Sequence, residues 1–89
     1  MSDHMLEIDF DGTKWSDPRI VPYHDLVLDP ATSVFHYATE CFEGMKAYRD
    51  EQGHVRMFRP MENVLRMNSS IERLCLPVYY LSIVLFVAC

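Results

Sequence analysis

The sequence of 89 residues has few of the residues that build phosphate loops and metal sites. Its three glycines, Gly12, Gly44 and Gly53, lie far apart, which excludes a glycine-rich phosphate-binding loop. The four histidines are too dispersed to form a ligand pair on one helix, and the three cysteines contain no metal-type pair. The sequence therefore predicts neither a phosphate-binding loop nor a zinc site.

Disulfide partners and clustered positive charge are also lacking. The three cysteines, Cys41, Cys75 and Cys89, are an odd number and cannot all pair in disulfides, which favours free thiols in a reducing compartment. Eight basic residues stand against thirteen acidic ones, the net charge is -5, and the basic residues are scattered. Because nucleic-acid binding needs basic side chains gathered to neutralise phosphates, the composition argues against a nucleic-acid partner. The acidic start "MSDHMLEIDF" predicts no signal peptide or amphipathic presequence.

What is present is the composition of a globular protein, with 49% hydrophobic and 24% charged residues. A chain near this size buries only ~60–65% of the surface that its unfolded form exposes, so its core is modest. The length predicts one small domain at most, or a piece of a larger one.

The first third of the chain predicts strands joined by a turn. His4–Phe10 alternates apolar and polar residues and predicts a strand. Asp11–Pro18 gathers glycine, serine, proline and aspartates, which is the composition of a turn. Arg19–Pro30 predicts an extended segment and then a short strand around Leu26–Leu28, because Pro22 makes the first half an edge or irregular stretch.

A short helix is expected within Ala31–Phe42. Ser33 suits its cap position, and Gly44 is expected to end it. Four residues share one face of this helix: Val34, Tyr37, Ala38 and Cys41.

A β-hairpin is predicted next. Met45–Arg49 and Val55–Phe58 have the pattern of strands, and the polar segment Asp50–Gly53 has a glycine placed for the turn. The alternation of side chains along a strand puts Lys46 and Tyr48 on one face.

Arg59–Pro77 has the clearest helical pattern in the chain. Pro60 suits the first helical position, Glu62 favours the positive N-terminal end, and Pro77 is expected to stop the helix. An apolar stripe recurs at helical spacing: Val64, Met67, Ile71 and Leu74. After it, the tail Val78–Cys89 has no charge and is too short to span a membrane, which takes ~20 apolar residues.

Four segments, in order and without an evident gap, resemble the N-terminal part of the branched-chain amino-acid aminotransferases. They are "SDHMLEIDF", "VFHYATECFEGMKAYRD", "VRMFRPMENVLRMNSS" and "LCLP". That family consists of pyridoxal-phosphate enzymes of fold-type IV, also called the D-amino-acid aminotransferase-like fold. The resemblance implies an α+β fold that is part of a small domain. It covers residues 1–77 as the N-terminal part of that domain and leaves 78–89 as a divergent apolar tail.

The resemblance also implies roles for three residues. Arg66, in the "RM" pair, matches the arginine that binds the phosphate of pyridoxal 5'-phosphate, a role that suits the planar donor fork of a guanidinium. Tyr37 and Phe42 match aromatic residues of the substrate pocket, partly supplied across a homodimer interface. A pocket for branched aliphatic side chains needs such apolar and aromatic walls. Without the resemblance, the sequence predicts that Arg66 is a surface arginine paired with Glu62 and that Tyr37 and Phe42 are core residues.

No catalytic residue is predicted in this chain. A pyridoxal enzyme needs a lysine that holds the cofactor as a Schiff base. The two lysines are Lys14, in a polar turn, and Lys46, in a predicted strand with its ammonium near solvent. The family's Schiff-base lysine comes from a second domain that no residue here matches. We therefore expect a truncated form that is inactive alone.

By resemblance, the complete enzyme transfers amino groups between leucine, isoleucine or valine and 2-oxoglutarate, as a homodimer in the cytosol or the mitochondrion. Two alternatives stay open. One is another enzyme of the same fold, a D-amino-acid aminotransferase or an aminodeoxychorismate lyase. The other is a non-catalytic interaction product whose apolar tail associates with membranes or partners.

Overall fold

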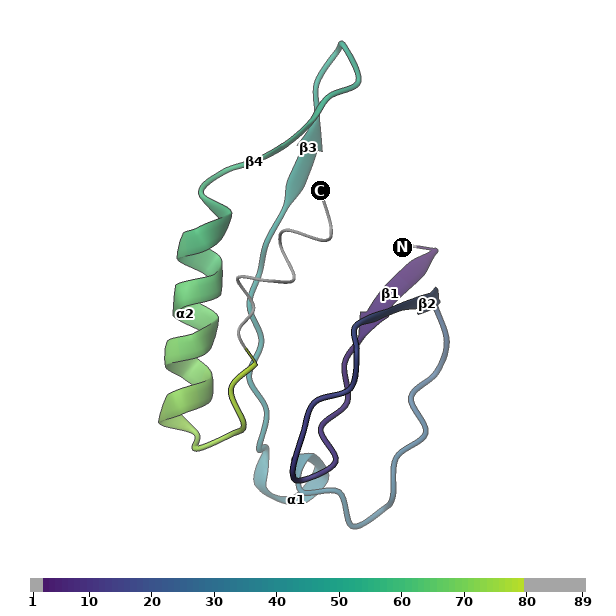
Figure 1. The fold of residues 1–89 in the computed structure, drawn as a ribbon, viewed down its shortest axis with the longest axis vertical. Coiled ribbons are helices and arrows are strands. Elements are labelled where there is room, and N and C mark those ends of the chain that lie inside the picture. Colours follow the sequence, from purple (N-terminus) through teal and green to yellow (C-terminus); the bar gives the residue numbers. More distant parts are fainter. Residues whose placement is uncertain (1–2, 80–89) are drawn as a thin grey trace. The chain divides into compact units, whose positions relative to one another are not determined.

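The computed structural model describes residues 3–79. The chain divides into two compact units, Met1–Thr39 and Glu40–Cys89. The described residues form two helices and two small antiparallel sheets in the order β1, β2, α1, β3, β4, α2 (Figure 1). The predicted α+β class is thus confirmed. The predicted tail falls outside the described residues except for Val78 and Tyr79, so the boundary at residue 77 stays a prediction.

The sheet of the first unit pairs β1 (His4–Glu7) with β2 (Arg19–Pro22) in antiparallel register, with Leu6 opposite Ile20. The predicted first strand is confirmed over its first half. The predicted strand around Leu26–Leu28 is wrong, because the second strand forms at Arg19–Pro22 instead. In a two-stranded sheet both strands are edge strands, and an edge strand tolerates a proline, which has no N–H to donate to the sheet.

The turn between these strands is confirmed and is stabilised by one aspartate. The Asp11 carboxylate accepts hydrogen bonds from the backbone N–H groups of Thr13 at 2.8 Å and Lys14 at 2.9 Å. Phe10 and Trp15 form a bridge across the turn, with ring centroids 5.0 Å apart. Such an aspartate turn satisfies backbone donors that would otherwise need water.

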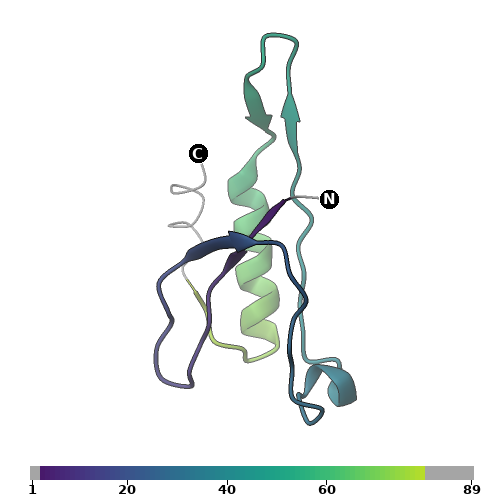
Figure 2. The same cartoon turned by 90° about the vertical axis from the view of Figure 1, so that its right-hand side faces the viewer.

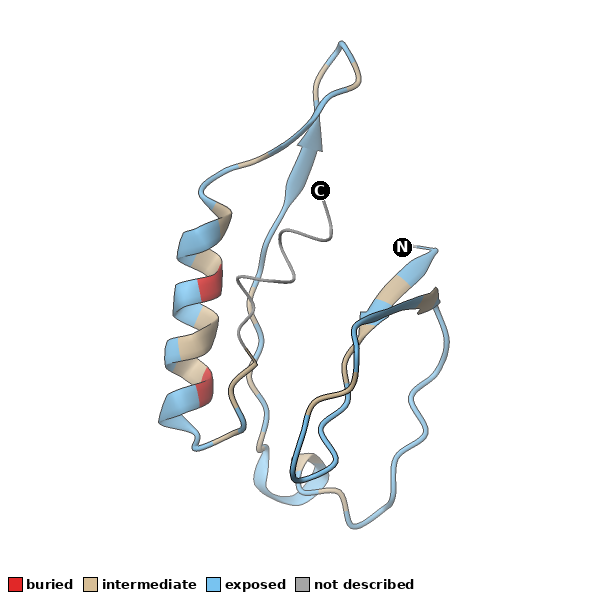
Figure 3. Ribbon diagram, viewed as in Figure 1, coloured by how far each residue is buried: buried red, intermediate tan, exposed pale blue. Residues whose placement is uncertain are grey.

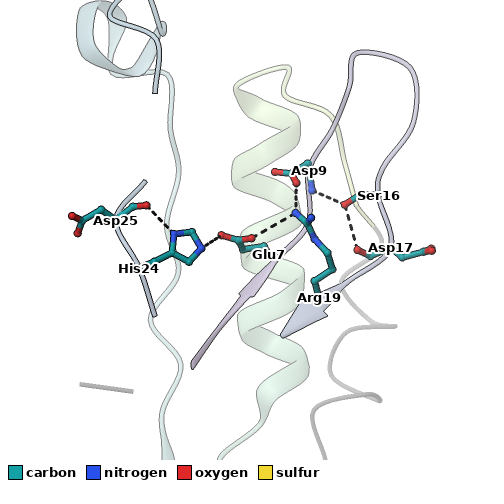
Figure 4. Close-up of polar contacts among 7 residues, drawn as sticks. All are labelled: Glu7, Asp9, Ser16, Asp17, Arg19, His24 and Asp25. Atoms are coloured by element: carbon teal, nitrogen blue, oxygen red, sulfur yellow. Dashed lines mark hydrogen bonds and ion pairs between the residues drawn. The ribbon is translucent and has the colours of Figure 1, made fainter. Parts of the chain in front are cut away.

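A chain of ion pairs joins β1 to β2 and to the segment after it (Figure 4). The Arg19 guanidinium lies 2.5 Å from the Asp9 carboxylate and 3.5 Å from that of Glu7. His24 places Nε2 2.9 Å from Glu7 and Nδ1 2.8 Å from the carbonyl of Asp25. The Asp25 carbonyl and the negative charge of Glu7 raise the pKa of His24 above its usual 6.5.

The helix predicted within Ala31–Phe42 is much shorter than expected. α1 spans Val34–Tyr37, a single turn, and ends where Ala38 takes a left-handed conformation with φ 49°. The prediction that Gly44 ends the helix is therefore wrong, and Cys41 does not share a helical face with Val34. Aromatic and β-branched side chains dominate this turn and lose rotamer freedom in a helix, which favours an early end. Ser33 precedes the helix without a side-chain cap bond.

In the second unit, β3 (Ala47–Arg49) and β4 (Val55–Met57) form the predicted hairpin with slightly shorter strands. Asp50 closes the turn by donating its N–H to the carbonyl of His54 at 2.9 Å. Gly53 has φ 87°, a left-handed conformation that glycine adopts without steric cost. Both views show this hairpin extending beyond the N-terminal end of the following helix (Figure 1, Figure 2).

The long helix α2 spans Pro60–Arg73 and confirms the strongest sequence pattern, including proline at its start. Its end differs from the prediction. Cys75 takes a left-handed conformation with φ 54°. Its N–H donates to the carbonyl of Glu72 at 3.0 Å, and the N–H of Leu76 donates to the carbonyl of Ile71 at 3.1 Å. These bonds form a Schellman motif, which caps the last carbonyls before Pro77 is reached.

The core of the described residues is small and lies on α2. Val64 is 7% exposed and Ile71 is 8% exposed, and they are the two buried hydrophobic residues of this part of the chain (Figure 3). Met67 of the predicted stripe is half-buried, whereas Leu74 is 43% exposed. Among residues 3–79, no helix is both long and apolar enough to cross a membrane.

Candidate functional site

The candidate site centres on a paired arginine and glutamate in the second unit. Arg66 lies in the middle of α2, and Glu43 lies in the extended segment that leads to β3 and runs beside the helix in both views (Figure 1, Figure 2). The Nε of Arg66 donates to Oε2 of Glu43 at 2.6 Å, and Nη2 donates to Oε1. The guanidinium therefore holds the carboxylate with two parallel hydrogen bonds, the arrangement to which arginine is best suited.

Two further donors fix the glutamate. Asn63 Nδ2 lies 3.1 Å from Glu43 Oε1, and the N–H of Gly44 donates to the same oxygen at 2.9 Å. Asn63 also donates to the carbonyl of Gly44 at 2.7 Å. Asn63 and Arg66 are three residues apart on α2 and thus share one face of the helix. One helix face therefore fixes the backbone and the side chain at Glu43.

The electrostatics follow from these contacts. The hydrogen bond from Arg66, assisted by Asn63, lowers the pKa of Glu43 from its usual 4.5 to about 2. The same carboxylate raises the pKa of Arg66. The Glu43 side chain is 16% exposed and that of Arg66 is 62% exposed. Both groups are therefore charged at neutral pH, with the arginine on the solvent side of the pair.

The aromatic candidates lie in different units. Phe42 directly precedes Glu43 in the second unit and is 91% exposed, whereas Tyr37 is the last residue of α1 in the first unit and is 82% exposed. Neither ring is core, which removes the plain packing interpretation within each unit. Phe42 and Arg66 share a unit, connected through the Glu43 contact.

Glu43 was missed by the sequence reasoning, which gave it no role and paired Arg66 with Glu62. Glu62 has only a minor charge effect on the pKa of Arg66. Both hydrogen bonds of the guanidinium fork, from Nε and from Nη2, go to Glu43 instead. A signal was present in the sequence. Glu43 stands among the uncharged residues Cys41, Phe42, Gly44 and Met45, and a carboxylate in apolar surroundings needs a partner.

Arg66 has the donor chemistry that a phosphate requires. A guanidinium carries five N–H groups, and the fork to Glu43 takes one from Nε and one from Nη2. The remaining donors belong to the solvent-exposed end of a side chain that already binds one anion. By contrast, residues 3–79 contain no group of three side chains able to hold a metal ion.

Comparison with known proteins finds relatives that share about half of the residues. The branched-chain-amino-acid aminotransferase of Dictyostelium discoideum is 49% identical over 79 residues, which are 88% of this chain and 21% of that protein. The mitochondrial and cytosolic enzymes of that name from Saccharomyces cerevisiae are each 52% identical over 79 residues, again 88% of this chain and 20% and 21% of theirs. No protein-family model matches. The chain spans about a fifth of the length of the curated relatives it matches.

Proposed function

Because the chain is similar over most of its length to branched-chain-amino-acid aminotransferases, as its sequence motifs predicted, we propose that it carries part of such an enzyme's cofactor and substrate site. The observation that carries the proposal is identity near one half across 85–88% of the chain. The reaction is amino transfer between leucine, isoleucine or valine and 2-oxoglutarate. The fold is the fold-type IV small domain, and the complete enzyme is a homodimer.

Arg66 would hold the phosphate of pyridoxal 5'-phosphate. Its guanidinium is exposed, charged and already oriented by Glu43, so it meets the chemical requirement for a phosphate anchor. When bound, the cofactor supplies the electron sink that amino transfer requires. The contribution of this chain's residues is binding and orientation of the phosphate end.

Phe42 and Tyr37 would line the pocket for a branched aliphatic side chain. Both rings are largely exposed in the described structure, which leaves them available as pocket walls in the complete enzyme. An aliphatic group has no polar handle, so recognition rests on apolar contact area. Relatives of this kind include both cytosolic and mitochondrial forms, and the compartment of this chain is proposed to be one of these two.

The test of the phosphate role is binding of pyridoxal 5'-phosphate compared with pyridoxal, which lacks the phosphate. We expect the 89-residue chain to bind the phosphorylated form more tightly, measured by titrating each compound against the backbone amide resonances of α2, which every variant retains. Arg66→Gln is expected to remove the difference, whereas Arg73→Gln on the exposed end of the same helix is expected to keep it. Equal binding of both compounds by the wild type would contradict the phosphate role.

We further propose that the chain alone does not catalyse transamination. Lys14 and Lys46 are both exposed, and a Schiff-base lysine needs burial or charged neighbours that favour its neutral amine. The measurement is incubation with pyridoxal 5'-phosphate, leucine and 2-oxoglutarate, followed by borohydride reduction and mapping of adducts. A stoichiometric adduct at Lys46 together with turnover would overturn this proposal.

A further inference from the structure

Glu43 is anchored independently of the arginine that it contacts. Its Oε1 accepts hydrogen bonds from Asn63 Nδ2 at 3.1 Å and from the N–H of Gly44 at 2.9 Å, and its side chain is only 16% exposed. Arg66, by contrast, is a long side chain that is 62% exposed. The carboxylate is thus the fixed member of the pair, and the guanidinium is the member whose orientation it determines.

The contact uses one particular edge of the guanidinium. Nε and Nη2 face the two oxygens of Glu43, so a planar guanidinium has its two Nη1 protons and the second Nη2 proton on the other edges. An arginine held in this way has lost the rotational freedom of its long side chain before any ligand arrives. Ordering that is already complete in the free protein does not weaken binding.

We propose that Glu43 is a positioning residue: it holds the Nε–Nη2 edge of Arg66 so that the Nη1–Nη2 edge is presented to a phosphate group. The inference rests on the proposed role of Arg66 as the phosphate anchor, and it adds the residue that sets the direction of its donors. Glu43 itself does not touch the phosphate.

Glu43 also has an opposing effect, because its negative charge repels a phosphate. Removing it therefore changes two things at once, the charge near Arg66 and the orientation of the fork. Glu62 separates them: it acts on Arg66 through charge and makes neither of the two fork hydrogen bonds. Glu62→Gln consequently serves as the control that removes one nearby charge and keeps the fork.

The experiment titrates inorganic phosphate into the isotope-labelled 89-residue chain. The Nη–H resonances of Arg66 measure the phosphate affinity, and the Nε–H resonance reports whether the contact with Glu43 is kept. In the wild type, this resonance is expected to be resolved and to stay in place at saturation, because the phosphate occupies the other edge. In Glu43→Gln it is expected to broaden, and phosphate affinity is expected to fall roughly threefold to tenfold below that of Glu62→Gln, through lost preorganisation.

Two results would overturn the proposal. One is a phosphate affinity in Glu43→Gln equal to or above that of Glu62→Gln. The other is displacement of the Nε–H resonance by phosphate, which would make Glu43 a competitor for Arg66 rather than its support. If the backbone amide spectrum shows that Glu43→Gln does not fold like the wild type, Asn63→Ala takes its place, because it loosens Glu43 and leaves both charges unchanged. A phosphate affinity in Asn63→Ala equal to or above that of the wild type would then overturn the proposal.

Failure of the proposed function gives a different result. Suppose that phosphate leaves every Arg66 resonance of the wild type unchanged while the Nε–H signal still depends on Glu43. The contact between Glu43 and Arg66 then exists, but Arg66 does not bind phosphate, and the positioning role of Glu43 is wrong as well. If phosphate binds at Arg66 equally well with and without Glu43, the anchor stands and the positioning role alone is wrong.

Discussion

The two units of the chain use the same chemical pair, an arginine and a carboxylate, in different surroundings. In the first unit, Arg19 pairs most closely with Asp9 (Figure 4). Their side chains are 53% and 73% exposed, so the pair is surrounded by water. In the second unit, the Glu43 side chain is 16% exposed, and its carboxylate accepts hydrogen bonds from Arg66, from Asn63 and from the backbone N–H of Gly44.

This difference separates a surface link from an organised site. An exposed ion pair is screened by water and contributes at most about 1 kcal/mol, so the pair at Arg19 joins neighbouring strands with little selectivity. A shielded carboxylate with several donors has one preferred geometry, and it passes that geometry to the arginine. The second unit is therefore where a ligand-binding arginine is expected to be effective.

The largest effect in this comparison is expected from the core that supports the second unit. Ile71→Ala removes one of two buried hydrophobic side chains of the described residues, and it should destabilise α2 by about 2 kcal/mol, the low end for such truncations because the core is small. Denaturant unfolding followed through the hairpin and helix resonances measures it. Leu65→Ala, at a site 58% exposed on the same helix, should change stability by less than about 0.5 kcal/mol. Equal losses in both variants would show that Ile71 is not a core residue.

The sequence predicted the parts of the fold that are specified locally. The hairpin turn needs only Asp50 and Gly53, and the start of α2 needs only Pro60, so both were found. The elements that depend on pairing or on backbone strain were not. Nothing local distinguishes Arg19–Pro22 from Leu26–Leu28 as the partner of β1, because that choice is made by the strand opposite.

Helix ends were missed for a related reason. Ala38 directly follows α1, and Cys75 lies two residues after the end of α2; both adopt left-handed conformations where glycine is the usual residue. A sequence pattern that searches for glycine or proline passes over such positions. Both residues carry a steric cost there, about 1–2 kcal/mol for a non-glycine residue, which the surrounding structure must offset.

The candidate site divides in the same way. Arg66, Tyr37 and Phe42 came from family resemblance, and their roles stay predictions. Glu43 lies 23 residues from Arg66 in the sequence, and no helical spacing links the two. The near neighbour Glu62 fitted the spacing rule for helical ion pairs, yet the partner that forms the fork is the distant Glu43, fixed by Asn63 and Gly44.

The next effect concerns acid. Because the pKa of Glu43 is lowered from 4.5 to about 2, chiefly by Arg66, the charged form favours the folded state. Its contribution to stability is fully present above about pH 4.5 and is lost as the pH falls through about 2. We expect the difference in melting temperature between the wild type and Glu43→Gln to shrink across this interval. Carboxyl-carbon NMR should place the Glu43 midpoint near 2, and Arg66→Gln should move it back toward 4.5. A midpoint that Arg66→Gln leaves unchanged would contradict the pairing.

The smallest effect is expected in the first unit, where a histidine titrates at higher pH than Glu43. The pKa of His24 is raised above 6.5 by the carbonyl of Asp25 and by Glu7, since both ring nitrogens face acceptors and only the imidazolium donates to both. Its contribution is therefore present below pH 6.5 and is lost as the pH rises through the higher folded value. Ring-proton NMR should show a midpoint above 6.5 in the wild type.

Two variants test the source of the His24 shift. Glu7→Gln should lower the midpoint only in part, because the larger contribution comes from the Asp25 carbonyl, which the variant keeps. Asp9→Asn, which removes a partner of Arg19 rather than of His24, should change it less than Glu7→Gln does. If Asp9→Asn moved the midpoint as far as Glu7→Gln, the direct contact would not be the cause. The ion-pair network of the first unit would then act as diffuse charge, in sharper contrast to the directed hydrogen bonds at Glu43.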